Sequence, residues 1–127
     1  YLSTARETIT LSIQIETAEA LQNLDEILAV QGIDGIFIGP SDLSASMGYT
    51  GQQNHPNVVG AAKEVITKAK AAGIFAGVNA FNPDQAQDYV DAGADFVNVG
   101  ADVALLARAT EQLAAKWTTV ETETTSY

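Results

Sequence analysis

The feature of this sequence that most constrains its fold is a fourfold alternation of short apolar segments with amphipathic helical segments. Four apolar runs predict buried strands, at residues 11–15, 34–38, 74–78 and 95–99. Apolar residues recurring every three or four positions predict helices at residues 18–28, 57–72, 83–92 and 103–117. Because strands that alternate with helices run parallel, we expect an α/β protein whose sheet is buried on both faces.

Two architectures fit this order: a small doubly wound sheet, or half of an eight-stranded β/α barrel. In both, ligands bind where the strands end. Four features fall at those ends and are expected to face one mouth: Glu16, the loop at residues 39–48, Asn79 and the turn at residues 100–102.

Composition bounds the function. The 127 residues suit one domain, and 46% hydrophobic residues suffice for a core. Six Lys plus Arg against 16 Asp plus Glu give a net charge of -10, which disfavours nucleic acid and anionic membranes as partners. Without cysteine, and without an apolar run of about 18 residues, we expect no disulfide, thiolate metal site or membrane span, as in a cytoplasmic protein.

The two ends of the chain carry separate expectations. The first residues lack the basic start and apolar core of a targeting segment, and they lack an initiating Met, so we expect the chain to begin inside something longer. Residues 118–127 are polar and aperiodic, and a disordered tail is expected there. The folded domain is therefore predicted at residues 1–117.

The first strand ends on a charged residue. Side chains alternate along a strand, so Gln14 and Glu16 point to the same side of the sheet. A carboxylate at the end of a buried strand needs a partner, which can be a cation, a metal ion or water.

The segment Gly39-Pro40-Ser41-Asp42 follows the second strand. Gly39 permits close approach of a ligand, and the amides of Ser41 and Asp42 could hold a small carboxylate. Asp42 also brings a second anion beside Glu16, an oxygen-rich pair suited to a hard ion such as Mg2+. The alternative is that Asp42 and Ser44 only cap a short helical turn. The sequence pattern leaves both readings open.

These segments resemble the HpcH/HpaI aldolase family, class II pyruvate aldolases related to 4-hydroxy-2-oxoheptanedioate aldolase. The resemblance covers about residues 1–117. It implies a TIM-type (β/α)8 barrel of the phosphoenolpyruvate/pyruvate type, with this chain as its second half, strands five to eight. The motifs that carry it are Gln-x-Glu-Thr at residues 14–17, Gly-Pro-x-Asp-Leu-Ser at residues 39–44, Met47-Gly48, His55-Pro56, Val-Asn-Val-Gly at residues 97–100 and Leu-Leu-Ala-Arg at residues 105–108.

The resemblance implies metal-dependent aldol cleavage or condensation of 4-hydroxy-2-oxo acids, giving pyruvate and an aldehyde. Glu16 and Asp42 would bind Mg2+, Mn2+ or Co2+, and Gln14 would touch the 2-oxo acid. The amides of Ser41 and Asp42 would hold its carboxylate. Asn79 departs from the apolar residue that the family commonly has near the aldehyde, so it is expected either to alter the preferred aldehyde or to bind water.

The family's catalytic histidine and arginine come from the first half of the barrel, so no catalytic residue is expected in this chain. His55 is interpreted as structural, and Arg6 and Arg108 are not well placed to replace the arginine. The lysines of the second helix, Lys63, Lys68 and Lys70, are interpreted as solvated surface, and the aromatic residues Phe75, Phe96 and Trp117 as core or subunit contacts.

A half-barrel would leave strand edges and its inner face open. Three explanations remain: a fragment of a full aldolase, an independent half-barrel that dimerises, or a non-catalytic module that binds a divalent metal and a small 2-oxo acid. The expected macromolecular partners are the first half of the barrel and, through exchange of the last helix, other subunits of a homo-oligomer.

Overall fold

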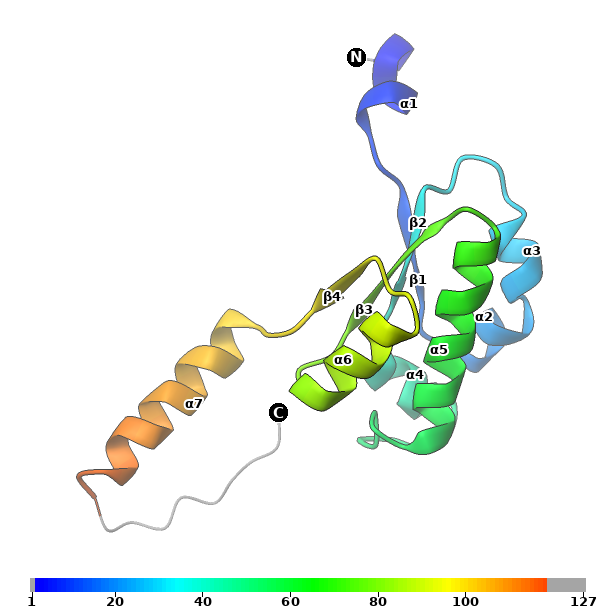
Figure 1. Cartoon of the computed structure of the whole chain (residues 1–127). Coiled ribbons are helices and arrows are strands. Elements are labelled where there is room, and N and C mark those ends of the chain that lie inside the picture. Colours follow the sequence, from blue (N-terminus) through cyan, green and yellow to red (C-terminus); the bar gives the residue numbers. More distant parts are fainter. Residues whose placement is uncertain (1, 119–127) are drawn as a thin grey trace.

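The computed structural model describes residues 2–118, which form a parallel sheet of four strands with helices packed against it (Figure 1). The strands are β1 (Ser12–Ile15), β2 (Gly35–Ile38), β3 (Phe75–Asn79) and β4 (Phe96–Asn98). A 3-10 turn (Leu2–Thr4) precedes the α-helices, which are α1 (Ala5–Thr8), α2 (Ala18–Gln22), α3 (Leu24–Leu28), α4 (Pro40–Ser46), α5 (Pro56–Ala71), α6 (Pro83–Asp91) and α7 (Asp102–Ala115). The predicted α/β class and parallel sheet are confirmed.

The strands follow one another in the order β1-β2-β3-β4, all parallel. A doubly wound sheet reverses its strand order part-way, and the described sheet has no such reversal. When each connection leads from one strand to the next neighbour in the same direction, and all connections are right-handed, the connecting helices lie on the same side of the sheet. Accordingly, α2, α3, α5 and α6 gather on one side in Figure 1. The expectation of a sheet covered on both faces is therefore wrong for the described residues.

The core lies between the sheet and this helical layer. Ile15, Ile38 and Val78 share one row of the register and are fully buried. The predicted apolar side of the helix at residues 57–72 packs against them: in α5, Val59 is partly buried, and the fully buried members are Val58, Ala62, Val65, Ile66 and Ala69. Full burial of such aliphatic side chains contributes about 1.5–3 kcal/mol each, so this layer supplies most of the hydrophobic stabilisation.

The opposite face of the sheet carries phenylalanine rings lying over glycines. The ring of Phe96 lies where a side chain on Gly77 would stand, and that of Phe75 likewise over Gly35. Phe37 stacks on Phe96 with ring centroids 5.7 Å apart. These rings lie outside the core cluster, and Phe96 is 43% exposed. Of the two roles expected for Phe75 and Phe96, a place in the core that the helices cover is therefore not observed, and a contact with another subunit stays a prediction.

Several boundaries differ from the prediction. The helix expected at residues 18–28 is interrupted at Asn23, a residue whose side chain competes with helical hydrogen bonding. The expected loop at residues 39–48 contains α4, which Pro40 opens. Two helices begin at side-chain caps of residue types that favour this position: Thr17 accepts a hydrogen bond from the Ala20 amide at 3.0 Å, and Asn82 accepts one from the Asp84 amide at 2.9 Å.

The lysines of α5 have exposed side chains, as predicted, and they also form ion pairs. Lys68 pairs with Asp25 of α3 at 3.0 Å, and Lys63 pairs with Asp88 of α6 at 3.4 Å. Lys70 bonds to Asp95, just before β4, at 2.5 Å. The three side chains thus connect α5 to neighbouring segments that lie far away in the sequence.

Helix α7 projects away from the sheet in Figure 1 and has no buried residue. Trp117, just past its end, is 84% exposed, so it is not a core residue in the described chain. Among residues 2–118, no helix has the length and apolar character to cross a membrane. Apart from residue 118, the predicted disordered tail lies outside the described residues.

Candidate active site

A cleft of about 110 Å³ opens where the strands end. It contains all five residues that the sequence analysis singled out for binding substrate or metal, which come from β1, α4 and β3. Its full lining is Gln14, Glu16, Gly39, Pro40, Ser41, Asp42, Gln53, Asn79, Ala80, Phe81 and Gln85. The position of these five side chains is therefore as predicted, whereas the turn at residues 100–102, expected at the same mouth, is not part of the cleft lining. The chemical roles of the five stay predictions.

The carboxylate of Glu16 is held on one side by an amide. Gln14 donates a hydrogen bond from Nε2 to Glu16 Oε2 at 3.0 Å. Because a carboxylate only accepts, this contact fixes which end of the Gln14 amide faces Glu16. The alternation of β1 thus pairs the two residues, as predicted from their spacing.

Gly39 leaves room for this carboxylate. A Cβ atom at Gly39 would lie 2.9 Å from Glu16 Oε2 and 3.9 Å from Asp42 Oδ2. Both carboxylates therefore lie within about 4 Å of one point beside the Gly39 backbone. Gly39 was expected to allow a ligand to approach closely. The structure gives a second reason for a glycine here, because a side chain would collide with the carboxylate of Glu16.

Asp42 does not cap α4. The helix begins after Gly39, and no side chain makes a cap hydrogen bond at this end. Ser44 lies inside the helix, fully buried, and donates from its hydroxyl to the Ser41 carbonyl at 2.7 Å. The capping alternative is therefore wrong, and the exposed Asp42 carboxylate is left to face the cleft.

The same helix start supplies free amides. Pro40 has no N–H, and in α4 the first backbone amide to bond back is that of Leu43, to the Gly39 carbonyl at 2.9 Å. The amides of Ser41 and Asp42 precede it and have no helical acceptor. They can therefore receive an anionic group at the edge of the cleft.

Asn79 extends the cleft as an amide. Its Oδ1 accepts a hydrogen bond from Asn98 Nδ2 of β4 at 2.9 Å, which leaves its own Nδ2 as the available donor.

Some residues of the cleft were not predicted from the sequence, among them Gln53, Phe81 and Gln85. Gln85 had a signal, since the Asn82-Pro83 helix start places it in the first turn after β3.

The histidine and the two arginines that were considered for a catalytic role, His55, Arg6 and Arg108, do not line this cleft. His55 stacks on Tyr49, ring centroids 3.9 Å apart, and its Nδ1 accepts from the Asn57 amide at 3.2 Å, a structural role as expected. Arg108 pairs with Glu111 within α7 at 2.6 Å. Arg6 lines a separate hollow of about 520 Å³ near Asp34, formed by residues that precede the strands rather than follow them.

The family model described as HpcH/HpaI aldolase/citrate lyase matches residues 3–109. This chain belongs to the HpcH/HpaI family. Most of the described fold, including every residue of the cleft, lies within the matched range.

Relatives within the HpcH/HpaI family agree with the match. A 4-hydroxy-2-oxo-heptane-1,7-dioate aldolase from Shigella sonnei is 48% identical over 117 residues, which is 92% of this chain and 45% of that protein. A solved HpcH/HpaI family protein from Burkholderia cenocepacia is 37% identical with a TM-score of 0.84, covering 91% of this chain and 45% of that one. An HpcH/HpaI aldolase from Desulfitobacterium hafniense is 30% identical with a TM-score of 0.84, covering 94% and 47%. The chain thus spans about half the length of the relatives it matches.

Proposed function

We propose that this chain forms the metal- and keto-acid-binding part of an aldolase that cleaves 4-hydroxy-2-oxo acids to pyruvate and an aldehyde. The observation that carries the proposal is the convergence of Glu16 and Asp42 on one point beside Gly39. The family membership and the printed activity of the Shigella sonnei relative support the reaction class.

We further propose that the chain is the second half, strands five to eight, of a β/α barrel. Three observations support this: the strand order is sequential, the helices gather on one side of the sheet, and the chain spans about half of its relatives. The phenylalanine rings on the open face would then be covered by the first half of the barrel.

The residues of the cleft fit a divalent ion. Two carboxylate ligands are what Mg2+ commonly takes from a protein, the remaining positions going to water and substrate. Within residues 2–118 no third acidic, histidine or cysteine ligand joins them. When bound, Mg2+, Mn2+ or Co2+ would act as a Lewis acid toward the keto oxygen of the 2-oxo acid.

The chain's own side chains and amides position the groups around that ion. Gln14 holds the carboxylate of Glu16 in place and keeps a second N–H for the 2-oxo acid. The amides of Ser41 and Asp42 hold the substrate carboxylate at the start of α4. Removal of the proton from the 4-hydroxyl is assigned to a histidine, and stabilisation of the enolate to an arginine, both from the first half of the barrel.

A non-catalytic module that binds a divalent metal and a small 2-oxo acid is the second candidate. The cleft lining, which among the described residues includes no histidine, lysine or arginine, is compatible with both candidates, so turnover separates them. Release of pyruvate from a 4-hydroxy-2-oxo acid once the first half of the barrel is supplied would support the aldolase. Binding without turnover under that condition would support the module.

Titration with Mn2+, followed by the electron paramagnetic resonance of the free ion, tests the shared metal site. Glu16→Gln removes one of two anionic ligands and should lower Mn2+ affinity at least about a hundredfold. The control is Glu19→Gln, the same chemical change on an exposed residue outside the cleft, and it should bind Mn2+ as the unchanged chain does. Equal affinity in both variants would reject the assignment of Glu16.

A further inference from the structure

The cleft has two chemically different sides. Glu16 and Asp42 make one side acidic, whereas Gln53, Asn79 and Gln85 make the other side neutral and rich in amides. We propose that Gln85 and Asn79 together form a subsite for a hydroxyl group on the aldehyde part of the substrate, so that the preferred aldehyde is small, neutral and hydroxylated. This inference rests on the proposed function of the cleft.

The surroundings of Gln85 fix the direction of its amide. Its Nε2 donates to the Gln53 carbonyl and to the Tyr89 hydroxyl, each at 3.5 Å. A carbonyl oxygen can only accept, so the nitrogen must face Gln53. Both N–H groups are then engaged inside the protein, and the carboxamide oxygen is the polar atom left for the cleft.

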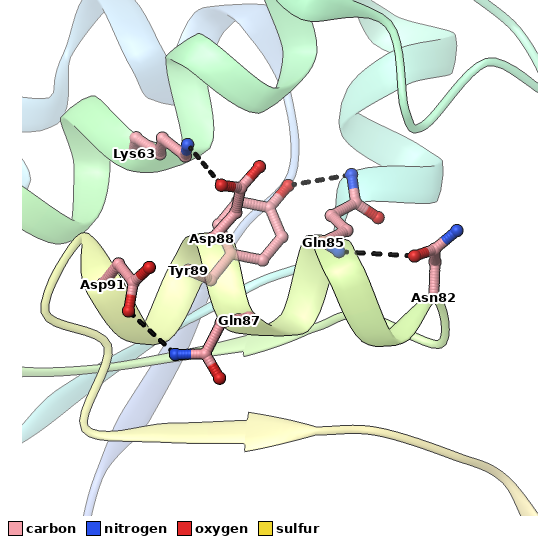
Figure 2. A network of polar contacts seen from close by, with 7 residues as sticks. All are labelled: Lys63, Asn82, Gln85, Gln87, Asp88, Tyr89 and Asp91. Carbon is pink, nitrogen blue, oxygen red and sulfur yellow. Dashed lines mark hydrogen bonds and ion pairs between the residues drawn. The ribbon is translucent and has the colours of Figure 1, made fainter.

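The helix that carries Gln85 is anchored at several points, as Figure 2 shows. Asn82 accepts from the Gln85 backbone amide at 3.3 Å, Tyr89 is fully buried, and Lys63 pairs with Asp88 at 3.4 Å. Burial, with a smaller contribution from the charge of Asp88, raises the pKa of Tyr89 to about 12. The Tyr89 hydroxyl therefore stays neutral near neutral pH, and the orientation of Gln85 does not change with pH in that range.

Asn79 complements Gln85. Because its Oδ1 is occupied by Asn98, Asn79 offers a donor to the cleft, while Gln85 offers an acceptor. A hydroxyl group both donates and accepts, so it can satisfy the two amides together. A methyl group in the same place would leave both polar groups without a partner, which lowers affinity.

A carboxylate on the aldehyde fits this side of the cleft poorly. It has no proton to give to the Gln85 oxygen, and it would lie in the same cleft as the carboxylates of Glu16 and Asp42. The relative from Shigella sonnei is named for a 1,7-dioate, a substrate with a second carboxylate. We therefore expect this chain to differ from that relative in its preferred aldehyde.

Oxamate derivatives separate this inference from the function on which it rests. Oxamate itself resembles pyruvate and is not cleaved. N-(2-hydroxyethyl)oxamate and N-propyloxamate add tails of equal length that end in a hydroxyl and a methyl group. Calorimetric titration of the Mn2+-loaded chain should show oxamate binding, and the hydroxyethyl compound should bind about fivefold more tightly than the propyl compound.

Matched glutamine variants locate the effect. Gln85→Met should abolish the fivefold preference and leave oxamate affinity unchanged, since oxamate does not reach this side. Gln87→Met is the control, because Gln87 is exposed, lies on the same helix and bonds only to Asp91, at 2.8 Å. Tyr89→Phe, which removes the hydroxyl that orients Gln85, should reduce the preference about twofold to threefold without changing oxamate affinity.

Two results would overturn the inference in different ways. The hydroxyl subsite is wrong, while the proposed function stands, if oxamate binds but the hydroxyethyl and propyl compounds bind equally tightly to the unchanged chain. The same conclusion follows if Gln85→Met keeps the preference for the hydroxyethyl compound that the Gln87→Met control shows. If oxamate does not bind to the Mn2+-loaded chain, the proposed function and this inference both fail.

Discussion

At the scale of single residues, the cleft depends on Gly39 as much as on the carboxylates. Its φ of -101° is open to any residue, so its role is not conformational. What excludes a side chain is the Glu16 carboxylate, 2.9 Å from where a Cβ would lie. A single methyl group at this position would push one proposed metal ligand away from the other.

Gly39→Ala should therefore weaken Mn2+ binding about tenfold, because Glu16 must turn away to relieve the contact. The free energy of unfolding should change by no more than about 1 kcal/mol, since the carboxylate lies in an open cleft and can move. Mn2+ titration and thermal unfolding measure the two effects.

Gly60→Ala is the matched control, because Gly60 lies in α5 with no atom within 4 Å of an added Cβ. It should raise stability by about 0.5–1 kcal/mol, as expected for replacing a helical glycine, and leave Mn2+ affinity unchanged. Unaltered Mn2+ binding in Gly39→Ala would contradict the steric role of Gly39.

At the scale of secondary structure, the lysines of α5 connect it to its neighbours: Lys63 and Lys68 to other helices, and Lys70 to Asp95 at the edge of β4. Both carboxylate oxygens of Asp95 accept a hydrogen bond, one from Lys70 at 2.5 Å and the other from the Ala76 amide at 2.9 Å. This residue therefore joins α5, β3 and the start of β4. The hydrogen bond from Lys70, followed by that from Ala76, lowers the pKa of Asp95 below its ordinary value of 3.8.

Because the folded pKa is the lower one, the stability that Asp95 contributes is complete well above pH 3.8 and is lost as the pH falls through the folded value. Asp95→Asn should lower the free energy of unfolding near pH 7 by about 1 kcal/mol, and this difference should shrink as the pH falls below 3.8 and through the folded pKa. Urea unfolding at several pH values measures it.

Asp91→Asn provides the comparison, since Asp91 accepts from Gln87 and forms no ion pair among the described residues. Its free energy of unfolding near pH 7 should differ from that of the unchanged chain by less than about 0.5 kcal/mol. A loss in Asp95→Asn that stays constant down to pH 2 would argue against an ionic contribution from Asp95.

At the scale of the whole molecule, the described residues leave apolar surface uncovered on the phenylalanine face of the sheet and along α7. Along α7, exposed apolar residues occupy positions that match the a and d positions of a heptad: Val103, Leu106 and Leu113. Such a stripe on a helix that has no buried residue in the described part of the chain is typical of a contact with another chain. We propose that α7 mediates association between copies of this protein.

Leu106→Glu should shift the sedimentation coefficient of the chain toward that of a monomer. Its thermal stability as a monomer should change by less than about 0.5 kcal/mol, because Leu106 is 68% exposed and contributes little to the core. Gln112→Glu adds the same charge at an exposed position of α7 and should leave association unchanged. Identical sedimentation of the Leu106→Glu variant and the unchanged chain would contradict the role of α7.

The sequence by itself determined the β/α order, the caps at Thr17 and Asn82, and the meeting of Gln14, Glu16, Ser41, Asp42 and Asn79 at one edge. These follow from local rules: side chains alternate along a strand, helices repeat every 3.6 residues, and parallel strands end together.

Only the tertiary structure decided how these residues are used. It showed that Asp42 faces the cleft instead of capping α4, and that Gly39 makes room for Glu16. It also brought the carbonyl of Gln53 to Gln85, 32 residues away. No local periodicity encodes such contacts, because they depend on the packing of segments that are distant in the sequence.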